Sequence, residues 1–366
     1  MKLECVKEKL QNAVMTADRA AGKNLSLPIL SNILLSAEKS GLRIRATNLE
    51  LGVEIKVPAK VETEGKVVVS GSVLGSLLSG IVGEKNIMLD LQDKNLVVVS
   101  HGNIARIKTQ PADDFPTIPK IENGIEVEIS AQAFVEGVKS VWYSTSVSTV
   151  KPEIASVYIY PEKGKLIFAA TDSFRLAERV LEPKKAILES PVLIPQKNLI
   201  EIVRIIETFP ESVHIISTKN QIAFITDGTY ITSRVIDGVF PDYRQIIPKE
   251  YKTEAIMLKQ DIISALRVTN LFSDKFHKIS FLVNPEGGEF KVAAFNTDIG
   301  ENTTTIDATL SGDPLTISFN HRYVLDCFQS IKDDSVVFRF NGEGRPLVIQ
   351  GVKEKGFLYL VMPMNR

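Results

Sequence analysis

LIFAATDSFRLAERV, at Leu166–Val180, has two counterparts in the chain: LRIRATNLELGVEI at Leu42–Ile55 and FKVAAFNTDIGENTTTI at Phe290–Ile306. Each stretch is a β-rich segment, a small polar pair and a second β-rich segment, which predicts two strands joined by a turn. In this alignment Asn48, Asp172 and Thr297 correspond, at separations of 124 and 125 residues. Because repeats of solenoid proteins are roughly 20–50 residues long, this spacing predicts three whole domains instead.

Two helices are expected in each repeat. The first is amphipathic, with apolar residues three and four apart: Val6, Leu10, Val14 and Ala17; Phe134, Val138, Val141 and Trp142; Leu258, Ile262 and Leu266. The second follows a short strand, in VVVSGSVLGSLLSGI (67–81), VLIPQKNLIEIVRII (192–206) and LTISFNHRYVLDCFQSI (315–331). Ser, Pro and Asn near these helix starts are typical of helix N-termini. The predicted fold class is therefore α+β, with two helices and several antiparallel strands in each of three domains.

The domain joints are predicted from two similar motifs, DDFP at 113–116 and GVFP at 238–241. We place the domains at 1–121, 122–247 and 248–366. If three such domains join edge to edge, the sheets form an outer wall and the helices lie on the inner side. An open strand edge then remains at each end, and a head-to-tail dimer covers both by closing a ring of six domains.

The composition excludes several classes of protein. A net charge of −1 over 366 residues argues against a protein that coats nucleic acid through bulk positive charge. Cys5 and Cys327 are far apart and outside any zinc-ligand spacing, so neither a disulfide framework nor a metal site is expected. No secretory leader or membrane span is expected either, which predicts a cytoplasmic protein without a cofactor.

Local charge segregation still allows contact with DNA. Basic residues occur on the predicted outward faces of the helices: Lys7, Lys9 and Arg19; Lys139, Lys197 and Arg204; Lys259, Arg267, Arg322 and Lys332. For any single residue a solvated helix face is the simpler interpretation. As a set they fit contacts to phosphate that do not read base sequence, as a sliding protein requires.

Six motifs, in order along the chain, identify a family. They are LPILSNILL at Leu27–Leu35, ATNLEL at Ala46–Leu51, PADDFP at Pro111–Pro116, ATDSFRLA at Ala170–Ala177, DGVFPDYRQIIPK at Asp237–Lys249 and VMPM at Val361–Met364. With them the chain resembles the bacterial sliding clamps, the beta subunits of DNA polymerase III, over essentially its full length. The resemblance implies a non-catalytic ring-shaped homodimer, loaded onto primed double-stranded DNA by an ATP-driven clamp loader, that gives the replicase processivity.

The resemblance also implies a docking pocket between the second and third domains. Its partners are the polymerase III alpha subunit, the clamp loader, and other polymerases and repair proteins that carry a short, mostly apolar peptide. Carried over by motif, the lining is Ile154, Thr171, Ser173, Phe174, Arg175, Leu176, Pro241, Ile246, Tyr323, Leu360, Met362 and Met364. Methionines give an adaptable apolar surface, and we expect Arg175 and Tyr323 to supply polar anchoring at the rim. The alternative is that the last segment is simply a strand with core methionines.

This sequence departs from the family pattern at two places. Ser173-Phe174 stands where the family commonly has Gly-His, which is expected to make the pocket floor less polar. The basic DNA-contacting residue that precedes the LPIL motif in the family is Asn24 here, so Lys23 is the substitute candidate. At the dimer seam, Ile104 and Ile107 are expected to meet Leu271 and Phe272 of the other subunit. For Ile107 a place in the core of its own domain is an equal alternative.

Two other functions remain to be weighed. Thr171, Asp172 and Arg175 could form the nucleophile, base and anion clamp of a hydrolase. However, the equivalent turns keep the polar character without the full set, which favours a structural turn capped by Asp172. The four histidines have no catalytic or metal-binding spacing. A peptide-binding scaffold unrelated to DNA is the third possibility.

Overall fold

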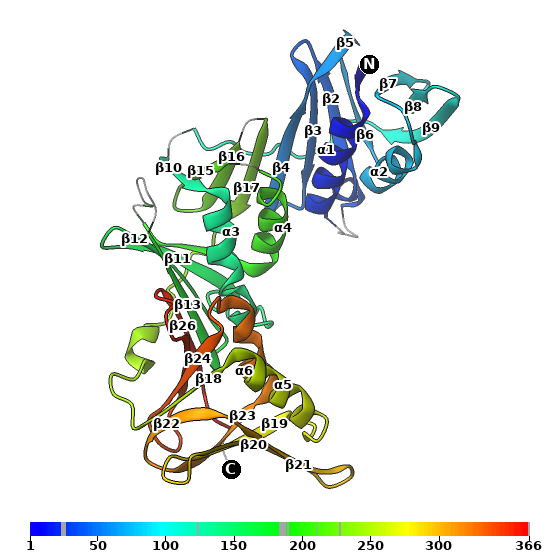
Figure 1. Ribbon diagram of the computed structural model, residues 1–366. Helices are drawn as coiled ribbons and strands as arrows, with labels where there is room; N and C mark the ends of the chain where they lie inside the picture. Colours follow the sequence, from blue (N-terminus) through cyan, green and yellow to red (C-terminus); the bar gives the residue numbers. More distant parts are fainter. Residues whose placement is uncertain are drawn as a thin grey trace. The chain divides into compact units, whose positions relative to one another are not determined.

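The computed structural model describes residues 1–22, 27–122, 124–182, 188, 190–209, 211–226 and 228–364. These residues form two compact units, each considered by itself below (Figure 1). The first unit is built mainly from residues 1–132 and 197–235, and the second mainly from residues 133–182, 190–196 and 236–364. The second of the three repeats therefore contributes strands to both units.

The described α-helices come in the three predicted pairs. They are α1 (Lys7–Ala20) and α2 (Gly71–Gly80), α3 (Ala131–Lys139) and α4 (Gln196–Ile206), and α5 (Lys259–Asn270) and α6 (His321–Asp326). Short 3-10 helices are η1 (Pro28–Ser31), η2 (Trp142–Ser144), η3 (Tyr243–Ile246) and η4 (Cys327–Ser330). The prediction for Trp142 was wrong, because α3 ends at Lys139 and Trp142 begins η2.

The first unit contains one sheet of thirteen antiparallel strands, in the order β10-β15-β16-β17-β4-β3-β2-β6-β9-β8-β7-β1-β5. Their bounds are β1 (Lys2–Val6), β2 (Ile33–Glu38), β3 (Gly41–Thr47), β4 (Leu51–Val57), β5 (Ala59–Thr63), β6 (Gly65–Val69), β7 (Asn86–Gln92), β8 (Asn95–Ser100), β9 (Asn103–Gln110), β10 (Ile125–Ser130), β15 (Ser212–Ser217), β16 (Gln221–Thr226) and β17 (Thr229–Arg234). The first and second repeats join in this sheet through β4 and β17, where Val53 pairs with Ile231.

The second unit contains a nine-stranded sheet, β14-β11-β12-β13-β26-β25-β24-β18-β22, and a four-stranded sheet, β21-β20-β19-β23. Their bounds are β11 (Ser156–Glu162), β12 (Lys165–Thr171), β13 (Arg175–Leu181), β14 (Val192–Pro195), β18 (Thr253–Leu258), β19 (Lys278–Asn284), β20 (Glu289–Asn296), β21 (Gly300–Ile306), β22 (Ala308–Gly312), β23 (Leu315–Asn320), β24 (Ser335–Phe340), β25 (Leu347–Gly351) and β26 (Phe357–Val361). The second and third repeats join through β13 and β26, where Ala177 pairs with Tyr359. The two joints thus use the same strands of the repeat.

The helices are fixed by capping and by burial of one face. Ser70 accepts a hydrogen bond from the Val73 amide at the start of α2, and Asn320 accepts from the first amides of α6. In the first unit α1 and α2 pack together beside the sheet (Figure 1), and in the second α5 packs against α6 and β21. Antiparallel sheets with paired helices confirm the predicted α+β class.

The segments that follow β9 and β17 pack on the outside of the sheets. Phe115 lies in an apolar cluster with Leu34 and Val68, and Phe240 lies in one with Leu176 and Leu360. The aromatic residues of the DDFP and GVFP motifs therefore anchor these linkers. None of the helices in the described part of the chain is both long and apolar enough to cross a membrane.

Candidate functional site

The turn between β12 and β13 is held by side chains of its own first two residues. The Asp172 carboxylate accepts hydrogen bonds from the amides of Phe174 and Arg175, at 2.9 and 3.0 Å. The Thr171 hydroxyl donates to the carbonyl of Arg175 at 2.7 Å and accepts from the Ser173 amide at 3.1 Å. These bonds keep Ser173 at a φ of 78°, a strained value for a residue with a Cβ. Asp172 does cap the turn, as the sequence indicated.

The first repeat builds the same turn with the same bonds. Asn48 accepts from the amides of Glu50 and Leu51, and Leu49, at a φ of 75°, occupies the place of Ser173. In the third repeat, the Asn296 side chain accepts a hydrogen bond from the amide of Asp298, two residues further along the chain. Three residues separate the strands in both turns, 172–174 and 297–299, but the side chain that accepts the amide here belongs to Asn296 and not to Thr297, which is aligned with Asp172.

Arg175 links this turn to α6. Its Nε donates to Asp172 at 3.0 Å, and one terminal nitrogen donates to Asp326. The guanidinium also lies over the ring of Tyr323, with 4.6 Å from Cζ to the ring centroid. Since its side chain is only 11% exposed and already engaged by two carboxylates, Arg175 holds the site together. Its expected role in the polar anchoring of a peptide at the rim stays a prediction.

Asp326 was not predicted as a site residue, although its spacing from Tyr323 was a signal in the sequence. It follows Tyr323 by three residues, and residues three apart on a helix share a face. The Tyr323 phenol is the group that stays available near the rim. Burial, followed by the Asp172 carboxylate, raises the pKa of Tyr323, so the phenol remains protonated and can donate a hydrogen bond.

Phe174 forms an exposed aromatic edge of the site. Its side chain is stacked on Tyr323, with ring centroids 6.4 Å apart, and the residue is 60% exposed. The expectation that Ser173-Phe174 would change the floor of a pocket was wrong, because the turn aims Phe174 outward. The apolar character is added at the rim.

An apolar core cluster lies beside the turn. Leu176 and Leu360 are fully buried side by side on β13 and β26, and Met362 packs against their cluster while remaining partly exposed. The Met362 amide donates to the carbonyl of Phe174 at 2.8 Å. Near the same linker, Pro241 is exposed and Ile246 is 47% exposed, whereas Ile154 is buried.

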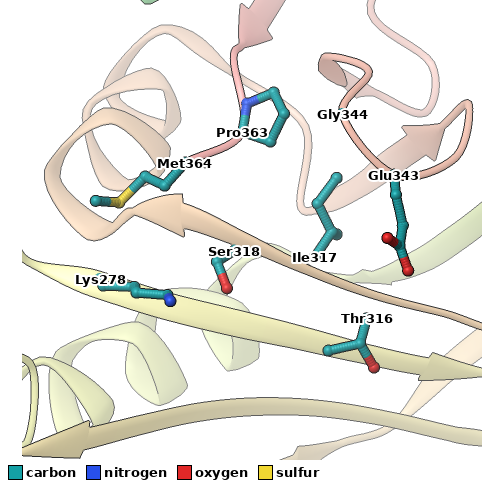
Figure 2. A pocket seen from close by; sticks show the side chains of 8 residues that line it. All are labelled: Lys278, Thr316, Ile317, Ser318, Glu343, Gly344, Pro363 and Met364. Atoms are coloured by element: carbon teal, nitrogen blue, oxygen red, sulfur yellow. The ribbon is translucent and has the colours of Figure 1, made fainter. Parts of the chain in front are cut away.

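The last described residues border a separate cavity of about 510 Å³ (Figure 2). Pro363 and Met364 form one wall, and the strands β19 and β23 carry polar residues, among them Lys278 and Ser318, on another. The Met364 amide donates to the Ser318 carbonyl at 2.8 Å. Met364 thus turns away from the Leu176–Leu360 cluster. Apart from Met364, the residues lining this cavity were not among the predicted site residues.

The candidate DNA-facing residues have mixed surroundings. Lys23 lies outside the described residues. Lys139 is exposed on α3, Lys197 is ion-paired with Glu50 at 2.5 Å, and Arg204 is ion-paired with Glu201 at 2.7 Å. Both pairs are exposed, so they are weak and exchangeable with phosphate.

Of the candidate seam residues, Ile104 and Ile107 lie on β9, and Leu271 and Phe272 directly follow α5. Ile104 and Leu271 are 63% and 68% exposed, and Phe272 is half-buried. Ile107 is 8% exposed, within the core of its own repeat. β9 pairs with β8 over Asn103–Lys108, and β21 pairs with β20 at the end of its sheet.

The hydrolase interpretation does not survive this geometry. The Thr171 hydroxyl is held by the turn, and Arg175 is neutralised by two carboxylates. A nucleophile needs an adjacent base, and an anion clamp needs a free guanidinium.

Comparisons with known proteins agree along the whole chain. Models of the N-terminal, central and C-terminal domains of the DNA polymerase III beta subunit match residues 1–119, 128–242 and 244–365. A beta sliding clamp of Synechococcus elongatus is 27% identical over 372 residues, covering 100% of this chain and 99% of the relative. The solved beta subunit of Thermotoga maritima has a TM-score of 0.94 at 25% identity, covering 100% of this chain and 99% of that one. A sliding clamp of Bartonella birtlesii, solved bound to griselimycin, has a TM-score of 0.94 at 25% identity, with 100% of both chains covered.

Proposed function

The chain belongs to the DNA polymerase III beta-subunit family, the sliding clamps, and we propose that it works as a head-to-tail homodimer closed around double-stranded DNA. It is a non-catalytic processivity subunit of the polymerase. The domains are placed at 1–121, 122–247 and 248–366, so that each linker stays with the domain on which its phenylalanine packs. We place its action in the cytoplasm, which suits two unpaired, buried cysteines.

The ring proposal rests on one observation, that the two internal joints pair the same two strands of the repeat. Leu51 pairs with Ser233 at the first joint, and Arg175 pairs with Val361 at the second. Each joint uses the strand after the polar turn of one repeat and the last strand of the next. A third such joint requires β21 of one copy and β9 of another, because these are the corresponding strands.

The register of this third joint follows from the other two. Within each repeat, the residue at the joint also pairs with the first buried residue of the strand before it. Ser233 pairs with Ile222, and Val361 pairs with Leu347. In the first repeat the equivalent pair is Ile107 with Leu96. Gly300 begins β21 as Arg175 begins β13. The seam would therefore pair Ile107 with Gly300 of the other copy, Arg106 with Glu301, and Ile104 with Thr303. The side chains of a strand stand on its two faces, and its backbone hydrogen bonds lie at its edges. The Ile107 side chain can therefore stay in the core of its own domain while the Ile107 backbone pairs across the seam.

We propose Leu271 and Phe272 as apolar contacts beside the seam, since α5 packs on β21. Lys23, Lys139, Lys197 and Arg204 are proposed contacts to DNA phosphates, which position a duplex without reading its sequence. The site around Arg175, Phe174 and Tyr323, with the exposed parts of Pro241, Ile246 and Met362, is proposed to bind partner peptides of the polymerase III alpha subunit, the clamp loader, and other polymerases and repair proteins. Clusters of aromatic, Met and Ile side chains with a phenol donor at the rim suit such peptides.

Retention on DNA of different topology tests the ring. The purified chain is loaded by its clamp loader onto nicked circular plasmid, and its solution mass is measured by light scattering. We expect a dimer that stays on circles and is lost when the plasmid is linearised, because a threaded ring slides off free ends. A monomer with equal retention on both forms would favour a peptide-binding scaffold without a topological link.

A further inference from the structure

A second cavity lies at the joint between β4 and β17 in the first unit, and residues of that unit line it. Its volume is about 620 Å³, within the range of ligand-binding pockets. It is enclosed by α1, the end of β4, the end of α4 and the turn before β17, elements that lie in one part of Figure 1. Lys9, Asn12, Ile55, Lys56, Thr208 and Phe209 are among its lining residues.

The repeat supplies a counterpart for this place, at the joint between β13 and β26. The Lys56 amide donates to the Gly228 carbonyl at 2.7 Å, and the Val180 amide donates to the Gly356 carbonyl at 2.7 Å. Both glycines have positive φ, at 79° and 99°. Lys56 therefore corresponds to Val180, and the preceding residues, Ile55 and Arg179, correspond to each other.

At the second joint Arg179 fills the space. The residue is 3% exposed, and its guanidinium donates to Glu136 and Glu354. Lys332 adds an ion pair to Glu136 at 2.7 Å. Burial opposes the charge of Glu136, but hydrogen bonds from Lys332 and Arg179 outweigh it and lower the pKa of this carboxyl. Charged partners from β13, α3 and the third repeat thus close the joint from inside.

The first joint lacks every member of this cluster. Ile55 is shorter than arginine and uncharged. Asn12 occupies the α1 position that Glu136 has on α3, the fifth residue after the first of each helix. Glu207 likewise stands where Lys332 follows α6, at the same distance from the helix start, so a carboxylate replaces the cation of the cluster. The space that arginine and its carboxylates occupy in one joint is consequently left open in the other.

The cavity at the first joint carries positive charge, as a site that binds anions does. Lys9 and Lys56 are exposed at the cavity, and none of the described residues that line it carries a carboxylate. Hydroxyl and amide donors, Thr208 and Asn12 among them, face the same space, together with the ring of Phe209. Two cations beside apolar walls fit a short segment that carries carboxylates and an apolar side chain.

We propose that this cavity binds an acidic peptide segment of a partner protein, with carboxylates on Lys9 and Lys56 and an apolar side chain against Phe209. The bound segment would fill the space at the first joint, as the Arg179 side chain of the chain itself fills the space at the second. This docking site is separate from the one around Arg175.

Fluorescence anisotropy of the full chain tests the proposal, with a labelled hexapeptide of alternating glutamate and leucine as the probe. We expect saturable binding that Lys9→Glu combined with Lys56→Glu weakens about tenfold or more, since each charge-assisted contact becomes a repulsion. Lys60→Glu combined with Lys66→Glu is the matched control, because it makes the same charge change at exposed positions of β5 and β6 outside the cavity. Equal binding by the double variant, or displacement of the probe by oligothymidylate as readily as by unlabelled peptide, overturns the proposal.

A second variant tests the cavity itself. Ile55→Arg with Asn12→Glu rebuilds the arrangement of Arg179 and Glu136 in the first joint. We expect the rebuilt chain to lose the peptide while Lys9 and Lys56 remain. If a folded rebuilt chain still binds the peptide with unchanged affinity, the cavity is not the site. Should the rebuilt chain fail to fold, the surface variants decide the question alone.

Discussion

At the scale of single residues, Arg175 connects the peptide-site turn to α6. Replacing it by alanine leaves Asp172 and Asp326 without their shared cation and removes the support under Tyr323. We expect a loss of about 1–3 kcal/mol in the free energy of unfolding, less than for a fully buried pair because Asp326 is 38% exposed. Binding of a labelled peptide from the cognate alpha subunit should weaken about tenfold or more, because Phe174 and Tyr323 lose their fixed positions.

Urea unfolding and peptide anisotropy measure the two effects. Arg175→Lys should rescue neither, since one ammonium does not reproduce the planar contacts to both carboxylates. Lys355→Ala, an exposed change in the same unit, is the control. An Arg175→Ala chain with normal stability and normal peptide affinity would show that the linkage has no role.

The sequence predicted the peptide turn well at this scale but not its charge partners. Its polar pair and its capping Asp172 followed from residue types, because short-range hydrogen bonds depend on nearby residues alone. Asp326 comes from another repeat, so only the folded chain brings it to Arg175. Phe174 was misplaced because the direction of a side chain depends on the positive φ at Ser173, which the motif does not reveal.

At the scale of elements, the linker after β9 is held by one buried carboxylate on β4. Glu54 is 3% exposed and receives Arg45 at 2.6 Å and Lys120 at 3.1 Å. Burial raises the pKa of Glu54, but hydrogen bonds from Lys120 and Arg45 outweigh it and lower the pKa overall. Its stabilisation is therefore complete above the ordinary glutamate pKa of about 4.3 and is lost as the pH falls through the lowered value.

Glu54→Gln tests this linkage. At neutral pH we expect it to cost about 1–3 kcal/mol in unfolding free energy, because three cations, Arg43, Arg45 and Lys120, lose their buried partner. Below the lowered pKa the two chains should converge, since the native carboxyl is then protonated as well. Urea midpoints from neutral to acid pH provide the measurement, with Glu62→Gln, in an exposed pair with Lys2, as control. Curves that stay parallel down to acid pH would contradict the assignment.

The elements themselves were largely predictable, and their ends were not. Apolar periodicity located the first helix of each repeat, because amphipathic spacing is a direct record of burial, and capping residues after a short strand located the second. It placed Trp142 in a helix, since a 3-10 turn after α3 continues the apolar pattern without the α-helical bonds. The two linkers are held by different polar contacts, which the sequence motifs do not predict. Glu54 is surrounded by cations, whereas Tyr243 on the second linker donates to Glu178 and contacts Tyr160.

At the scale of the whole molecule, three repeats were visible in the sequence because each keeps its own core and turn. How copies of the chain assemble depends on edges, and a sequence does not mark which strands stay unpaired. The two internal joints supply that information, since they define one register for a joint of this kind. Applied to β9 and β21, this register sets Arg106 of one copy against Glu301 of the other. Directly opposed residues of opposite charge stabilise an antiparallel pair, and like charges destabilise it.

A charge swap across the seam tests both the dimer and its register. Arg106→Glu alone and Glu301→Arg alone would each place like charges opposite one another at both seams of the ring, weakening dimerisation about tenfold. The two changes together restore the opposition and should recover most of the affinity, as sedimentation over a dilution series would measure. Lys60→Glu, exposed on β5, controls for net charge. If both single changes weaken the dimer and the double change does not recover it, the register is shifted. If neither weakens it, the copies meet through other strands.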